Sequence, residues 1–100
     1  MSGNEESVII KIGSKGYEVE YLKEVVVNEN IQWGSINYGQ CEIKIDNTLC
    51  DDMKFNALIH EILHACLYEI GSPLHKDEQF TEALGNMLAQ VVNDNRDNYE

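Results

Sequence analysis

The sequence predicts an α+β fold in which a small antiparallel sheet of two hairpins packs on two helices. Two observations support this prediction. Apolar residues alternate with polar ones over much of residues 8–46, and they recur at helical spacing from residue 51 to about residue 93. A chain of 100 residues, 43% of them apolar, has material for one modest core. We therefore expect a single domain over residues 1–100, with flexible ends at residues 1–7 and 94–100.

The first predicted hairpin joins residues 8–12 to residues 17–21. In both segments every second residue is apolar, which is the period of a strand with one buried face. The Gly-Ser-Lys-Gly run at residues 13–16 separates them as a turn. Residues 25–30 begin as a β-branched run and end in Asn-Glu-Asn, so they fit a strand end or a loop equally well.

The second predicted hairpin lies within residues 31–46. Trp33, Ile36 and Tyr38 precede a turn at Gly39-Gln40, and an alternating apolar run at residues 41–45 follows it.

Two helices are predicted after this hairpin. The first starts beyond Thr48, with Asp51 and Asp52 at the positive end of its dipole, and it stops at Gly71-Ser72-Pro73. The second covers about residues 77–93. Each has an apolar stripe at helical spacing: Phe55, Leu58, Ile59, Ile62, Cys66 and Ile70 in the first, and Phe80, Leu84, Met87, Leu88 and Val91 in the second.

The charge of the chain limits its partners. The formal net charge is -11 with only seven Lys and Arg residues, which argues against binding a nucleic-acid backbone. An acidic surface remains compatible with a basic protein partner. Residues 1–7 lack the features of a secretory signal, and no segment approaches membrane-spanning length. The three cysteines (Cys41, Cys50 and Cys66) contain no C-x-x-C pair and fit reduced thiols. We expect a cytoplasmic protein that does not enter a membrane.

The segment His60-Glu61-Ile62-Leu63-His64 carries the chemistry. Two histidines four residues apart on a helix project from the same face and can bind one metal ion. Glu61 lies about 100° further round the helix, where its carboxylate can reach a water on that ion as a general base. Since a catalytic zinc takes three protein ligands and keeps one position open, a third ligand must come from elsewhere in the chain.

Glu82 on the second helix is the favoured third ligand. Asn86 lies one turn further on the same face and is expected to orient a ligand histidine by a hydrogen bond. Glu78, one turn before Glu82, and His75, between the two helices, are the alternatives that the sequence leaves open.

These residues resemble the active-site helix of zincin metallopeptidases. The sequence Glu82-x-x-x-Asn86 is similar to the glutamate helix of the gluzincin branch, and the order of elements resembles the small bacterial and phage domains of the ImmA/IrrE type. The resemblance implies a minimal zincin-like domain that binds Zn²⁺ through His60, His64 and Glu82. It implies hydrolysis of a peptide bond by a zinc-bound water that Glu61 activates, in a protein or peptide substrate. It also suggests that the strand at residues 41–45 aligns an extended substrate along its edge.

Two other functions remain open from the sequence. The chain can be a non-catalytic zinc-binding modulator, encoded by a phage or prophage, that binds a protein partner. It can also be a structural domain in which the histidine spacing is accidental. Metal content and cleavage distinguish these functions.

Overall fold

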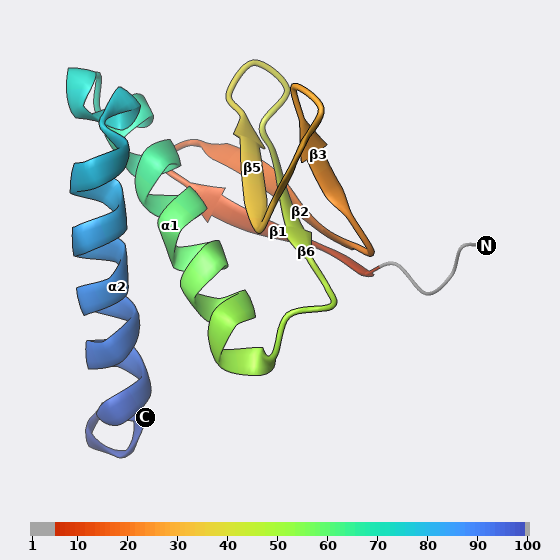
Figure 1. Ribbon diagram of the computed structural model, residues 1–100. Coiled ribbons are helices and arrows are strands. Elements are labelled where there is room, and N and C mark those ends of the chain that lie inside the picture. The colour runs from red at the N-terminus through yellow and green to blue at the C-terminus, as the bar shows by residue number, and fades with distance from the viewer. Residues whose placement is uncertain (1–5, 100) are drawn as a thin grey trace.

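The computed structural model describes residues 6–99 and confirms the α+β class (Figure 1). The helix α1 lies between the helix α2 and the strands. The strands are β1 (Glu6–Ile12), β2 (Lys15–Leu22), β3 (Val25–Val27), β4 (Asn30–Gln32), β5 (Gly34–Asn37) and β6 (Glu42–Asp46). The helices are α1 (Asp51–Glu69), α2 (Glu78–Asp94) and two short 3₁₀ helices, η1 (Pro73–Lys76) and η2 (Arg96–Asn98).

Both predicted hairpins are present, and they join into one sheet. β1 pairs antiparallel with β2, and β5 pairs antiparallel with β6. The two hairpins meet through β2 and β6, which run parallel, so the strand order is β1-β2-β6-β5 and the sheet is mixed rather than purely antiparallel. Because β6 has a neighbour on each side, the strand expected to offer its edge to a substrate lies inside the sheet. β5 is the edge strand on that side.

Residues 25–30, which the sequence left open, contribute to a third hairpin. β3 and β4 form a separate two-stranded sheet, with Val27 opposite Asn30. The two residues between them, Asn28 and Glu29, both have positive φ, at 51° and 68°. Two consecutive positive φ values are characteristic of a type I′ turn, whose twist suits a tight hairpin.

The two helices begin and end at residues that the sequence indicates. Asp51 and Asp52 lie in the first turn of α1, where carboxylates interact favourably with the helix dipole. Gly71, just beyond the end of α1, has a φ of 79°, a conformation that glycine adopts without steric cost. Asp77 caps α2, since its Oδ1 accepts a hydrogen bond from the backbone N–H of Phe80 at 3.0 Å.

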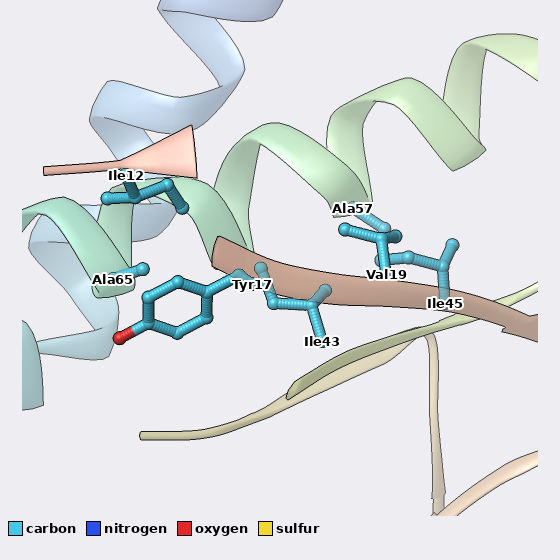
Figure 2. Packing of buried hydrophobic residues seen from close by; sticks show 7 residues of the cluster. All are labelled: Ile12, Tyr17, Val19, Ile43, Ile45, Ala57 and Ala65. Carbon is cyan, nitrogen blue, oxygen red and sulfur yellow. The ribbon is translucent and has the colours of Figure 1, made fainter. Parts of the chain in front are cut away.

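The core lies between the sheet and α1 (Figure 2). The strands contribute large side chains and α1 contributes small ones, which lets the helix approach the sheet closely. The buried cluster consists of Ile12, Tyr17, Val19, Ile43, Ile45, Ala57 and Ala65.

The helix α2 contacts α1 through small side chains. Thr81, Gly85 and Ala89, spaced by four residues, are its buried positions. The predicted apolar stripe of α2 does not coincide with these buried positions, because Phe80, Leu84, Met87, Leu88 and Val91 are 36–59% exposed. A Cβ added to Gly85 would lie at an ordinary contact distance of 3.5 Å from the Cα of His60, so α2 packs close to α1 here and leaves room for a small side chain.

Regular secondary structure reaches into both segments that were expected to be flexible. Residues 6 and 7 belong to β1, and η2 lies within the expected C-terminal tail, whereas residues 1–5 and 100 lie outside the described part of the chain. The guanidinium of Arg96 lies 5.6 Å from the ring centre of Phe55, and the amide of Asn95 donates to the carbonyl of Val91. These contacts attach η2 to the helices. Over residues 6–99, neither helix combines the length and apolar character needed to cross a bilayer.

Candidate metal centre

The two histidines of α1 face each other across one helical turn, as their spacing predicts. The Nε2 atoms of His60 and His64 lie 3.2 Å apart, and the two rings meet at an angle of 74°. His64 is buried, with 5% of its surface exposed, while His60 is half-buried and reaches the surface. The pair therefore presents two nitrogen ligands at one point, accessible from one side.

Glu78 brings a third possible ligand atom beside the two imidazoles. Its Oε1 lies 2.9 Å from the Nε2 of His60 and 3.2 Å from the Nε2 of His64. Neighbouring ligand atoms around a tetrahedral zinc are about 3.3 Å apart when each is about 2.0–2.1 Å from the ion. The three separations thus match one face of such a site, and the group formed by His60, His64 and Glu78 can hold a metal ion.

Glu82, the residue favoured from the sequence, lies outside this group. Because α2 begins at Glu78 and packs on α1 through Thr81, Gly85 and Ala89, its first residue comes beside the imidazoles. Glu82 lies one turn further along, exposed at the wall of the cleft described below. The structure therefore brings together the two histidines and Glu78, which the sequence had left as an alternative.

A backbone carbonyl orients the buried histidine. The Nδ1 of His64 lies 2.7 Å from the carbonyl oxygen of His75, which can only accept, so Nδ1 carries the proton. This carbonyl has the role that the sequence assigned to Asn86, which lines the cleft further along α2. In the neutral tautomer the Nε2 lone pair of His64 then faces the carboxylate of Glu78. Two acceptors 3.2 Å apart need a positive charge between them, either a proton or a metal ion.

The side chain of His75 lies outside the group that could hold a metal ion and packs beside it. Its Nδ1 lies 2.8 Å from the carbonyl oxygen of Ser72, and its ring packs edge-on against Tyr38 and Tyr68, which stack 4.3 Å apart. The hydroxyl of Tyr38 donates to the His75 carbonyl at 3.3 Å. Burial, followed by the charges of Glu61 and Glu78, raises the pKa of Tyr38 to about 12, so this hydroxyl keeps its proton at neutral pH.

Glu61 is a buried carboxyl group beside the metal ligands. Only 6% of its surface is exposed, and burial, with a further contribution from the charge of Glu78, raises its pKa from 4.5 to about 8. Its Oε2 packs against Gly34 of β5, where an added Cβ would lie 3.1 Å away. Gly34 was not singled out from the sequence, because its role depends on how closely β5 approaches α1.

The pKa of Glu78 shifts in the opposite direction. Partial burial acts to raise it, but the charges of His60 and His64 and their hydrogen bonds outweigh that effect and hold it below its usual value. The site therefore contains one carboxylate that stays ionised and one that exchanges a proton near neutral pH. Such a pair of environments is typical of acid–base sites.

His60, Glu61 and Glu78 line a cleft of about 650 Å³. Its floor comes from α1, with His60 and Glu61 among the lining residues. One wall comes from residues 31–34, which span the end of β4 and the start of β5 and are called the β4–β5 segment, and the other comes from α2, on the opposite side of α1 (Figure 1). A ligand in the cleft can therefore touch His60, Glu78, the buried carboxyl group of Glu61 and both walls.

No protein-family model matches this chain, and no curated protein or solved structure matches it. The function therefore has to be argued from the site itself.

Proposed function

We propose that this protein is a zinc-dependent peptidase in which His60, His64 and Glu78 hold the ion and Glu61 is the general base. The observation that carries the proposal is the convergence of three possible ligand atoms, from His60, His64 and Glu78, at the edge of a cleft that also contains the buried carboxyl group of Glu61. Two imidazoles and one carboxylate are a ligand set that zinc accepts in catalytic sites with an open position.

The fit of the residues to the ion rests on the hydrogen bonds of His64. The carbonyl of His75 fixes the proton on Nδ1, which leaves the Nε2 lone pair directed at the point where Glu78 Oε1 and His60 Nε2 also converge. A zinc ion bound there would polarise the carbonyl of a peptide bond and lower the pKa of a water ligand toward 7.

Glu61, Tyr38 and the strand β5 have different roles in the proposed reaction. Glu61 accepts a proton from the attacking water and returns it to the leaving amine, and the positive charge of a bound ion beside it would favour the ionised carboxylate that this role requires. Tyr38 keeps its proton, and its hydroxyl would have to turn from the carbonyl of His75 to donate a hydrogen bond to the developing oxyanion. The edge of β5, rather than β6, is available to pair with an extended substrate.

The proposal is tested first by metal content. Protein purified without added zinc is expected to contain close to one zinc per chain, and His60→Ala is expected to lose it. Glu82→Gln is the matched control, since it removes a carboxylate from the same cleft but outside the ligand group and should keep the metal. Only trace metal in the wild type would overturn the proposal.

Cleavage is the second test. Wild-type protein and Glu61→Gln, both loaded with zinc, are incubated with a mixture of unfolded polypeptides, and new termini are identified by mass spectrometry. Glu61→Gln is expected to keep the metal and lose cleavage, because the base is removed and the ligands remain. Equal cleavage by the two proteins would show that Glu61 is not the base.

A second function is favoured by one observation. The apolar stripe of α2 (Phe80, Leu84, Met87, Leu88 and Val91) is exposed, as expected of a helix that docks on another protein. A zinc-binding modulator that does not cleave would retain zinc in the wild type, show no new termini, and lose its partner when this stripe is made polar.

A further inference from the structure

The two walls of the cleft differ in chemistry. The wall from the β4–β5 segment carries Ile31 and Trp33, which are 65% and 54% exposed. The wall from α2 carries the polar side chains of Glu82 and Asn86. Large apolar side chains left exposed beside a reactive site stabilise a ligand by burying apolar surface when it binds.

The cleft is acidic. Its ionisable lining residues are His60 and three glutamates, and no Lys or Arg lines it within the described residues 6–99. Glu78 faces the two imidazoles, and Glu61 is buried against Gly34. Glu82 is exposed and lies outside the metal group, so its negative charge is available to a ligand. The net charge of -11 adds long-range attraction for a basic ligand.

We infer that the cleft selects an extended polypeptide segment that carries a large apolar side chain and a nearby Lys or Arg. The apolar side chain packs on Ile31 and Trp33, and the basic side chain pairs with Glu82 across α1. This inference rests on the proposed function, since it assigns the class of substrate to the same site. It also gives Glu82 a role in binding substrate rather than metal.

The test uses binding, so that it does not depend on turnover. Zinc-loaded Glu61→Gln protein is applied to an array of randomised 12-residue peptides. Bound peptides are expected to be enriched in Phe, Leu, Ile or Met together with Lys or Arg. Adding Ile31→Ser is expected to abolish the apolar enrichment and to weaken the best peptides about tenfold. Ile9→Ser is the matched control, because Ile9 is 62% exposed on β1 and does not line the cleft.

A second variant tests the preference for Lys or Arg in the bound peptides. Glu82→Gln is expected to weaken binding of the Lys- or Arg-containing peptides about two- to fivefold at low salt, and the difference should disappear in about 0.5 M salt. Glu24→Gln, an exposed carboxylate that does not line the cleft, is the control.

Trp33 gives an independent signal, because it is the only tryptophan of the chain. Its emission should shift to shorter wavelength when a selected peptide covers it. No enrichment, no bound peptide, or enrichment that survives Ile31→Ser would overturn the inference. The proposed function fails on different results, namely absent zinc or undiminished cleavage by Glu61→Gln, so the two failures are distinguishable.

Discussion

Replacing Glu61 by Gln is expected to stabilise the metal-free protein at alkaline pH. The carboxyl group is 6% exposed, and its pKa of about 8 exceeds the ordinary value of 4.5 that applies in the unfolded chain. Between these values the folded state binds more protons than the unfolded state, so stability falls as the pH rises. The stability that comes from protonation of Glu61 in the fold is fully present below about pH 4.5, and it is lost as the pH rises through about 8.

The magnitude follows from the two pKa values. Since each tenfold change in an equilibrium corresponds to about 1.4 kcal/mol, the buried negative charge costs at most about 5 kcal/mol above pH 8. For a domain of this size that is a large part of the total stability. Glutamine has nearly the same shape and does not ionise, so the variant escapes this cost.

The assay is urea denaturation of both proteins in the presence of a chelator, at pH 5 and at pH 8.5. The free energies of unfolding should be similar at pH 5, and the variant should be more stable by several kcal/mol at pH 8.5. A difference between the two proteins that does not change with pH would refute the reasoning, because it would show that Glu61 ionises as easily in the fold as in water.

Three further outcomes are expected. Glu78→Gln should weaken zinc binding at least about tenfold while Glu82→Gln leaves it unchanged; equal losses in competition with a fluorescent chelator would contradict the ligand assignment. Gly85→Ala should raise the free energy of unfolding in urea by about 0.5–1 kcal/mol, because alanine favours helix and the added methyl group would meet atoms of α1 at ordinary distances of 3.5–3.7 Å. A lower free energy of unfolding would mean that the two helices tolerate no added group. Asp77→Ala should cost about 1 kcal/mol by removing the cap of α2, and an unchanged melting temperature would argue against that cap.

Local patterns predicted the elements well. The alternation at residues 8–21 indicated a hairpin because a strand with one buried face repeats every two residues, and β1 pairs with β2. The parallel pairing of β2 with β6 was not predictable in the same way. It joins segments separated by residues 23–41, and no local signal states which strands of two hairpins become neighbours.

The candidate metal centre was predictable where it depends on residues that are close in the sequence. His60 and His64 share a face because of helical geometry alone. The third ligand depends on how α2 is rotated, and the apolar stripe of α2 was a poor guide because small residues face α1 instead. The His75 carbonyl that orients His64 is a backbone group, and backbone groups have no residue-specific signature.

The β3–β4 hairpin forms a sheet of its own, and its ladder shares no strand with β1, β2, β5 or β6. Its turn at Asn28 and Glu29 can consequently be lengthened, or its outer residues exchanged, while the ladders of the larger sheet stay intact. If the cleft binds peptides as proposed, changes in this hairpin would alter which peptides are accepted, while α1 and α2, which carry His60, His64 and Glu78, stay the same. A library randomised at residues 26–33 is thus a natural starting point for redirecting the protein toward chosen sequences.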